Sequence, residues 1–243
     1  MTQPLFNRKA MIFAAGRGER MRPLTDTCPK PLLPAGGKAL IEWQIERLAQ
    51  AGFTTIVVNH AWLGAQIEAR LGDGSRWGVA LRYSAEREAL ETAGGIAQAL
   101  PLLEDAGTPE IFLAVSGDVY SDFDYAHLAR HAERLAAQPA PGMHLVMVPN
   151  PPFHPSGDFA LDDHVCGTLS LDGAPRYTFG NIGLYDTRMF HGLPRGTRCA
   201  LKPYYRESIA RGLVTGELYE GVWENVGTPA QLADLDARLK RAQ

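Results

Sequence analysis

The chain has 243 residues, of which 45% are hydrophobic and 21% charged, values that are ordinary for a globular protein with a substantial core. The net charge of −3 and the lack of a basic run argue against a nucleic-acid-binding protein. The N-terminus lacks the pattern of a signal peptide, and no apolar stretch reaches the roughly 18 residues that a membrane helix needs, so we expect a cytoplasmic protein. The three cysteines, Cys28, Cys166 and Cys199, are far apart and fit reduced thiols better than a disulfide framework or a zinc site.

The first predicted strand, at residues 10–13, leads into a loop of small residues that holds Gly16 and Gly18. Such a loop brings backbone N–H groups against a phosphate, because glycine has no Cβ to block a close approach. Arg20 and Lys30 add positive charge, and Lys30 lies between two prolines that restrict its backbone. A Walker A loop is excluded by the spacing, and a dinucleotide fingerprint by Met21 in place of its third glycine. A G-x-G pair alone would be an ordinary turn, but the whole block predicts a phosphate site.

Apolar strands alternate with amphipathic helices through the first 150 residues. Strands are expected at 54–58, 79–83 and 111–115, and helices at 40–50, 63–71 and 95–103. The alternation predicts a Rossmann-like α/β fold, in which a mixed, mostly parallel sheet is flanked by helices. Ligands of such sheets bind beyond the carboxyl ends of the strands, where the glycine loop and Asp118 are both expected.

Shorter strands are expected beyond residue 142, at 144–148, 158–161, 177–185 and 214–219. A final helix has Thr228 as its cap, Pro229 in its first turn and Gln231 at the capping-box position. Asp118 follows a strand and a glycine, an arrangement that suits a metal ligand but also an ordinary turn. Ser116 lies two residues earlier, so we expect it on the same side of the strand.

The block at residues 14–31 resembles the signature of the sugar-1-phosphate nucleotidyltransferases, which runs approximately [LF]-A-x-G-x-G-x-R-[ML]-x-P-L-T followed by P-K-P. The resemblance implies a nucleoside triphosphate over the loop and Mg²⁺ as the cofactor. It implies Lys30 at the α-phosphate and Arg20 at the outer phosphates as catalytic residues, whereas Arg17 and Arg22 are expected to face outward. The implied nucleotide contacts are Ala15, Gly16, Gly18, Glu19, Arg20, Lys30, Gly94 and Ser116.

The resemblance also implies two metal ligands, Asp118 and Asn225. Asn225 stands where many family members resemble Trp-x-Asp-x-Gly-Thr, so this chain departs from the common pattern. An amide oxygen can bind Mg²⁺ but carries no charge, and we therefore expect weaker metal affinity. Glu224 is expected on the opposite face of its strand, where it cannot supply the missing charge.

Residues 59–64, 90–92 and 157–159 resemble the branch of this family that uridylylates N-acetylmuramate 1-phosphate, which makes UTP and that sugar the implied substrates. The implied substrate-binding residues are Glu91, Asp158, Asn181 and Asn225. For Asp158 a turn that enters a strand is an equal alternative, and residues 179–183 differ from that branch, which leaves the sugar open. We expect a single domain, with about residues 8–142 as the nucleotide-binding half and about residues 143–243 as the sugar-binding half.

Two other functions stay open. The first is a guanylyl- or thymidylyltransferase that acts on mannose, heptose or glucose 1-phosphate. The second is a regulatory protein that binds a nucleotide-sugar without turnover, which only Asn225 favours, since Arg20, Lys30 and Asp118 are all present. The sequence does not specify an oligomeric state, and a monomer fits it.

Overall fold

A single mixed sheet of nine strands forms the centre of the protein, in a computed structural model that describes residues 8–163 and 166–242. Its order is β5-β4-β1-β6-β11-β8-β12-β10-β9. The strands are β1 (Lys9–Phe13), β4 (Thr55–His60), β5 (Ala80–Ala85), β6 (Ile111–Ser116), β8 (Met143–Val148), β9 (Phe159–Leu161), β10 (Gly167–Ser170), β11 (Arg176–Asp186) and β12 (Val214–Leu218). Only β10 and β11 run against the other seven, so the sheet is mostly parallel, as the alternation predicts.

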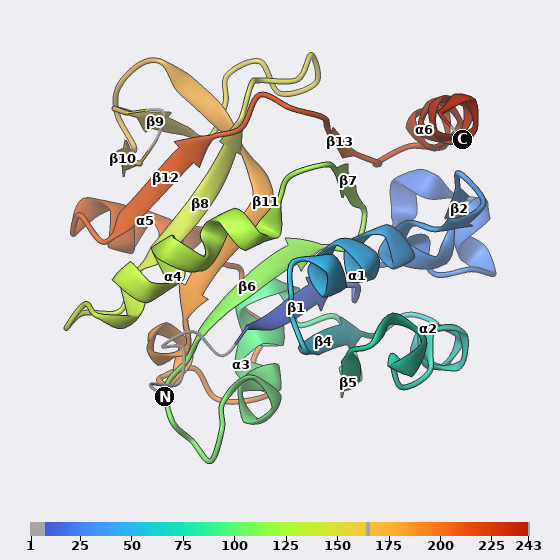
Figure 1. Ribbon diagram of the computed structural model, residues 1–243, viewed down its shortest axis with the longest axis horizontal. Coiled ribbons are helices and arrows are strands. Elements are labelled where there is room, and N and C mark those ends of the chain that lie inside the picture. Colours follow the sequence, from blue (N-terminus) through green and yellow to red (C-terminus); the bar gives the residue numbers. More distant parts are fainter. Residues whose placement is uncertain (1–7, 164–165, 243) are drawn as a thin grey trace.

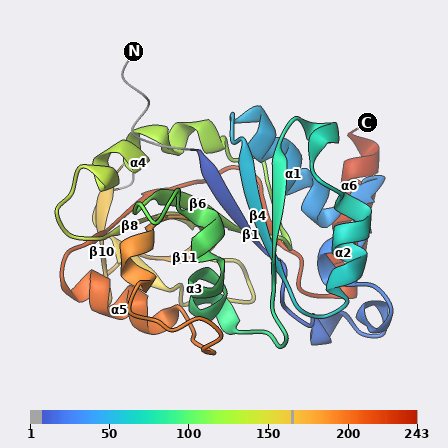
Figure 2. The ribbon, with the colours of Figure 1, turned by 90° about the horizontal axis from the view of Figure 1, so that it is seen from below.

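Helices cover both faces of the sheet (Figures 1 and 2). On one face lie α1 (Leu40–Gln50), α2 (Gly64–Leu71) and α4 (Ala129–Ala136), and on the other lie α3 (Glu91–Leu103) and α5 (Lys202–Ala210). After Lys9, strand β1 is apolar because both of its faces are covered: Ala10 and Ile12 pack into the first layer, and Met11 packs into the second. None of the helices in the described ranges is long and apolar enough to cross a membrane.

Short elements complete the fold between the main strands and helices. They are β2 (Pro34–Ala35), β3 (Lys38–Ala39), β7 (Val119–Ser121), β13 (Trp223–Asn225), and the 3-10 turns Glu19–Met21, Leu24–Asp26, Lys30–Leu32, Ser75–Trp77, Tyr125–Leu128 and Thr187–Phe190. The last helix, α6 (Pro229–Arg241), joins Met21 and Leu33 in a small separate cluster through Leu232 and Leu235. Met21 is fully buried there, so α6 holds the end of the glycine loop in place.

The start of α6 differs in one detail from the expected capping box. Thr228 Oγ1 accepts a hydrogen bond from the Gln231 amide, as predicted. The Gln231 side chain accepts instead from the amide of Gly227 at 2.8 Å, one residue before the cap. The shifted bond ties the helix to the residue that borders the glycine-loop pocket.

The two predicted halves of the chain are neighbouring parts of one sheet. Residues before 142 supply β5, β4, β1 and β6, and later residues supply the other five strands. Strand β11 joins them, since it pairs with β6 on one side and with β8 on the other. Between Phe179 and Gly183 this strand has a bulge, which interrupts the ladder close to the carboxyl end of β6.

Candidate functional site

The glycine loop leaves β1 over the carboxyl end of the sheet, and buried polar side chains fix its start. Asn59, at the end of β4, accepts a hydrogen bond from the Ala14 amide at 2.9 Å. Glu86 accepts in turn from Asn59 Nδ2 at 2.7 Å and from the Leu90 amide at 2.8 Å. Burial raises the pKa of Glu86 above its ordinary value. These bonds connect the glycine loop to the segment that leads into α3.

The fold requires glycine at only one of the two glycine positions of the loop. Gly18 has a φ of +67°, and a Cβ built on it would lie 3.0 Å from Lys30 Cβ. This position therefore needs glycine for folding, both for its left-handed backbone and for the close approach of Lys30. A Cβ built on Gly16 would meet no atom within 4 Å, and its backbone is not left-handed. The fold does not require glycine at position 16, which borders open space in the pocket.

Arg17 and Arg22 support the loop from outside the pocket, as expected. The Arg17 guanidinium lies over the Trp62 ring, 3.9 Å from its centre, and donates to the carbonyl of Thr25 at 2.6 Å. Arg22 forms an ion pair with Asp26 at 2.8 Å. Neither arginine lines the pocket, so the positive charge inside it comes from other residues.

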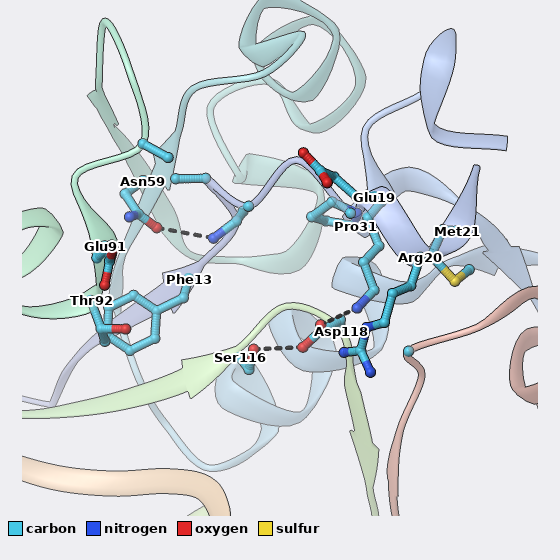
Figure 3. Close-up of a pocket in the computed structure, with 17 residues that line it drawn as sticks. Phe13, Glu19, Arg20, Met21, Pro31, Asn59, Glu91, Thr92, Ser116 and Asp118 are labelled. Carbon is cyan, nitrogen blue, oxygen red and sulfur yellow. Dashed lines mark hydrogen bonds and ion pairs between the residues drawn. The ribbon is translucent and has the colours of Figure 1, made fainter. Parts of the chain in front are cut away.

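Lys30 and Asp118 form an ion pair at the centre of the pocket (Figure 3). The Lys30 side chain is 11% exposed, and the Ser116 hydroxyl donates to Asp118 Oδ1 at 2.6 Å. Gly117 makes this turn possible, because its amide donates to the Phe13 carbonyl at 2.9 Å and a Cβ would lie 3.0 Å from that oxygen. The glycine thus lets β6 end directly beside β1, which brings Asp118 to the loop.

A cavity of about 460 Å³ lies between the glycine loop and the start of α3. It brings together nine of the predicted site residues: Ala15, Gly16, Gly18, Glu19, Arg20, Lys30, Glu91, Ser116 and Asp118. Arg20 extends into the space beside Asp118, whereas Glu91 and Thr92 lie across the pocket (Figure 3). Within the described part of the chain the Arg20 side chain makes no hydrogen bond or ion pair, so its charge is available to a ligand.

Gly94 is not brought to this pocket. It is buried in α3, and its amide donates to the Cys199 carbonyl at 3.0 Å. A Cβ on Gly94 would lie 2.3 Å from the Thr197 carbonyl oxygen, so this glycine allows the segment before α5 to pack on α3. Its position does not support the nucleotide contact that the resemblance implies.

Two more cavities extend the pocket toward the second half of the chain. One, of about 770 Å³, is lined by Asp158, Asn181 and Asn225, together with Lys202 and Arg206 of α5. The other, of about 310 Å³, shares Phe13, Thr92 and Ser116 with the first pocket and Asn181, Lys202 and Tyr205 with the large cavity. Because the linking cavity borders both, the three form one cleft along the carboxyl ends of the strands.

Two predicted substrate residues in this cleft have left-handed backbone although neither is glycine. Glu91 has a φ of 60° and Asn181, in the bulge of β11, a φ of 54°. Such a conformation costs about 1–3 kcal/mol and persists where the surroundings fix it, often at ligand sites. The Glu91 carboxylate pairs with Arg198 at 2.9 Å, so it is also linked to the segment before α5.

Asp158 fits both alternatives that the sequence left open. Its Oδ2 accepts a hydrogen bond from the Phe179 amide at 2.8 Å, and its Oδ1 lies 3.2 Å from His154 Nε2. The first bond supports the bulged strand, as a structural residue would. Asp158 also lines the large cavity, where it is accessible to a ligand.

Asn225 ends β13 and lies opposite Val119 of β7, the residue that follows Asp118. The amide of Val226, the next residue, donates to the Asp118 carbonyl at 2.9 Å. The side-chain oxygen of Asn225 is buried and has no hydrogen-bond partner among the described residues, which is unusual for an amide and suits a ligand oxygen. Glu224 forms an ion pair with Arg238 of α6, so its carboxylate does not replace the charge that Asn225 lacks.

Comparisons with known proteins agree with this arrangement. Residues 9–154 match the family model described as nucleotidyl transferase. The N-acetylmuramate alpha-1-phosphate uridylyltransferase of Neisseria meningitidis is 50% identical over 230 residues, which cover 94% of this chain and 97% of that protein. The chain belongs to the nucleotidyl transferase family.

Other relatives extend the comparison along the whole chain. A second N-acetylmuramate alpha-1-phosphate uridylyltransferase, from Caulobacter vibrioides, is 34% identical over 96% of this chain and 97% of its own length. The crystal structure of a putative glucose-1-phosphate thymidylyltransferase from Bacillus anthracis has a TM-score of 0.80 at 20% identity and covers 96% of this chain and 95% of its own. That likeness shows that the nucleotidyl transferase fold is shared. The glycine loop, Lys30 and Asp118 lie within the matched segment, and Asn181 and Asn225 lie beyond it.

Lys202 and Arg206 are cleft residues that sequence reasoning missed. They lie one turn apart on α5, and neither makes a hydrogen bond or ion pair within the described residues. The available signal was a cationic and aromatic stretch, Lys202-Pro203-Tyr204-Tyr205-Arg206, whose proline marks a helix start. Tyr205 donates to or accepts from Tyr185 at 2.8 Å, and burial raises the pKa of both hydroxyls, so both stay protonated.

Proposed function

We propose that this protein transfers a uridylyl group from UTP to N-acetylmuramate α-1-phosphate, with Mg²⁺, and releases pyrophosphate. One observation carries the proposal: a single cleft holds the glycine loop with Lys30 and Asp118 at one end, and at the other end two cations of α5 that have no partner in the described part of the chain. The choice of UTP and of this sugar is supported by the names of two relatives that match over 97% of their own length.

The chemistry asks for charge and position rather than for a general base. The second pKa of a phosphate monoester is about 6, so the sugar phosphate is already mostly dianionic at neutral pH. Its oxygen forms a new bond to the α-phosphorus of UTP, and the bond from that phosphorus to the bridging oxygen breaks. The electron pair leaves on pyrophosphate. The protein must hold two anions in line and offset their repulsion.

Lys30 and Arg20 are the residues that would offset it. An ammonium group has three N–H donors, so Lys30 can keep Asp118 and also donate to an α-phosphate oxygen. Arg20 has no partner within residues 8–163 and 166–242 and points into the same space, where it would bind the leaving pyrophosphate. The amides beside Gly16 would approach the phosphates closely, because no Cβ stands between them and the open pocket.

The residues present also fit a magnesium ion. Asp118 would supply a carboxylate oxygen, and Asn225 would supply the buried amide oxygen that has no protein partner. When bound, Mg²⁺ would neutralise part of the phosphate charge. Both oxygens of Asp118 already accept hydrogen bonds, from Ser116 and from Lys30, so these neighbours fix the direction of its carboxylate.

The free cations of α5 support an anionic sugar. N-acetylmuramate carries a lactyl carboxylate in addition to its phosphate, and N-acetylglucosamine 1-phosphate lacks that carboxylate. Lys202 borders both the linking cavity and the large cavity, and Arg206 borders the large cavity only. We assign Lys202 to the sugar phosphate and Arg206 to the carboxylate, which a guanidinium can bind through two hydrogen bonds.

The primary test is pyrophosphate release with Mg²⁺ across four triphosphates and several sugar 1-phosphates. We expect release with UTP and N-acetylmuramate 1-phosphate, and loss of release when EDTA removes the metal. Release with GTP or dTTP and a neutral sugar would keep the site and overturn the substrates. Silence with every pair, from a folded protein that still binds nucleotide, would support the regulatory alternative.

A matched pair of assays tests the sugar assignment. We expect Arg206→Ala to raise KM for N-acetylmuramate 1-phosphate about tenfold or more, since a hydrogen-bonded charge pair contributes about 1.5–3 kcal/mol. Any turnover of N-acetylglucosamine 1-phosphate should change less than twofold, because that sugar has no carboxylate to lose. Equal effects on both sugars would show that Arg206 does not read the lactyl group.

A further inference from the structure

The loop between β8 and β9 places Phe153 at the large cavity of the cleft. Among the large apolar side chains that are exposed in the described ranges, that of Phe153 is the most exposed, at 58%. The others, Leu24, Trp62 and Val222, border none of the three cavities of the cleft. An apolar side chain that is open to solvent inside a binding cleft offers a surface that a ligand can cover.

The loop holds Phe153 in this position. The His154 amide donates to the Pro151 carbonyl at 2.8 Å, which closes a tight turn with Phe153 at its tip. Asn150 Nδ2 donates to the Arg176 carbonyl at 3.0 Å, and this bond ties the loop to β11. Four of the ten residues at 149–158 are prolines, whose fixed φ restricts the backbone further. The ring is therefore positioned before a ligand arrives, which lowers the entropic cost of binding.

A second aromatic side chain, that of Trp223, borders the same cavity from β13. Its Nε1 donates to the Gly180 carbonyl at 2.8 Å, so the indole is fixed against the bulge of β11. Phe153 and Trp223 also both border a smaller hollow of about 270 Å³ beside α6. The loop after β8 and the chain that leads into β13 both lie at the upper end of the molecule in Figure 1. These two side chains form what we call the aromatic edge of the cleft.

The cavity beside the aromatic edge is the one that the proposed function assigns to the sugar. Lys202 and Arg206 line it from α5. The linking cavity, which leads to the nucleotide pocket, is not lined by Phe153 or by Trp223. A pyranose ring carries hydroxyl groups around its rim and C–H groups on its faces. A flat aromatic ring can therefore cover one face of a sugar and leave the hydroxyls to polar side chains.

We propose that the Phe153 ring packs on the apolar face of the bound sugar and is a specificity residue for it. This assignment rests on the proposed function, because it takes the sugar to be the occupant of the large cavity. The sugar would contact the aromatic edge through its C–H groups, and Lys202 and Arg206 through its anionic groups. Phe153 has no charge and no proton to transfer, so its contribution is to the affinity for the sugar and not to bond formation.

Two ligands that differ only by the sugar test the assignment: UDP-N-acetylmuramate, the product of the proposed reaction, and UDP. Calorimetric titration in Mg²⁺ measures both dissociation constants. We expect Phe153→Ala to weaken UDP-N-acetylmuramate about five- to twentyfold, the effect of uncovering part of one aromatic ring, and to change UDP less than about twofold. Because the ring is mostly exposed, Tm should change by less than about 1 °C.

Matched variants separate a contact with the sugar from a general effect on the loop. Phe153→Trp keeps a flat ring and should bind UDP-N-acetylmuramate within about threefold of the wild type. Val222→Ala removes an exposed apolar side chain next to Trp223 that borders no cavity of the cleft, and it should change neither dissociation constant.

Two results would overturn the assignment: a Phe153→Ala protein with unchanged affinity for UDP-N-acetylmuramate, or one that loses affinity for UDP to the same extent. A different result would contradict the proposed function itself, namely a wild-type protein that binds UDP-N-acetylmuramate no more tightly than UDP. The role of Phe153 is then decided with the nucleotide-sugar that the wild type does bind, again compared with the nucleotide without its sugar.

Discussion

Alanine substitutions at Gly16 and Gly18 should have opposite effects on stability. At Gly16 an added Cβ meets no atom within 4 Å and the backbone is not left-handed, so alanine is tolerated and restricts the unfolded chain. We expect Gly16→Ala to raise the free energy of unfolding by about 0.4–1 kcal/mol. At Gly18 the left-handed backbone costs alanine about 1–2 kcal/mol, and the Cβ contact with Lys30 at 3.0 Å adds to that cost.

The two variants should therefore differ by about 2 kcal/mol, which corresponds to about 4–8 °C in Tm for a chain of this length. Nucleotide affinity should follow a different order. The Gly16→Ala methyl group extends into the pocket, where it separates backbone amides from the phosphates. Loss of one such hydrogen bond to a charged group costs about 1.5–3 kcal/mol, or roughly ten- to a hundredfold in the dissociation constant of UTP.

Thermal unfolding without nucleotide measures the first effect, and calorimetric titration with UTP and Mg²⁺ measures the second. The informative result is a Gly16→Ala protein that is at least as stable as the wild type and binds UTP weakly. If Gly16→Ala binds UTP normally, the open space beside Gly16 is not where the phosphates lie. If it unfolds as readily as Gly18→Ala, the assignment of separate roles to the two glycines is wrong.

Three further predictions concern the pocket and its support. Lys30→Met should lower kcat/KM about a hundred- to a thousandfold, because it removes charge stabilisation at the α-phosphate. As the control, Lys38→Met breaks an ion pair with Glu46 outside the cleft and should change kcat/KM less than twofold. Asn225→Asp should lower the Mg²⁺ concentration for half-maximal activity about tenfold. It should also lower Tm in EDTA, because two carboxylates then lie close together. An unchanged Mg²⁺ requirement would contradict the ligand role of Asn225. Gln44→Leu should cost about 2–4 kcal/mol in urea unfolding, because it leaves the buried Tyr125 hydroxyl and a strand carbonyl without partners, and a loss below about 1 kcal/mol would contradict this.

The sequence predicts the core of this fold well because periodicity is a local signal. The strands at residues 10–13 and 111–115 are apolar on both faces, and the structure covers both faces with helices. Helices α4 and α5 and strands β7 and β10 were not predicted, and the strand that was expected at Glu224 had no predicted partner. Each is short, and β7 and β13 exist as strands only because residues about a hundred positions apart pair with each other. No local window contains that information.

Only the part of the site that is close together in sequence could be predicted. The glycine loop and Lys30 are close in sequence, and their spacing alone indicates a phosphate site. Lys202 and Arg206 enter the cleft because α5 packs beside the bulge of β11, which composition does not reveal. The fold also brings Cys166 to His131, 35 residues away in the chain, and the sequence gives no signal of this contact.

The attachment of α6 to the glycine loop links activity to the order of synthesis. The Gly36 amide donates to Asp236 Oδ1 at 2.9 Å, although the two residues are 200 positions apart. During synthesis on a ribosome the loop residues emerge long before α6, and Met21 can be buried only after α6 has been made. A partly made chain would then carry Arg20, Lys30 and Asp118 without the arrangement that lets them act together, and would have little hold on cellular nucleotides until α6 packs.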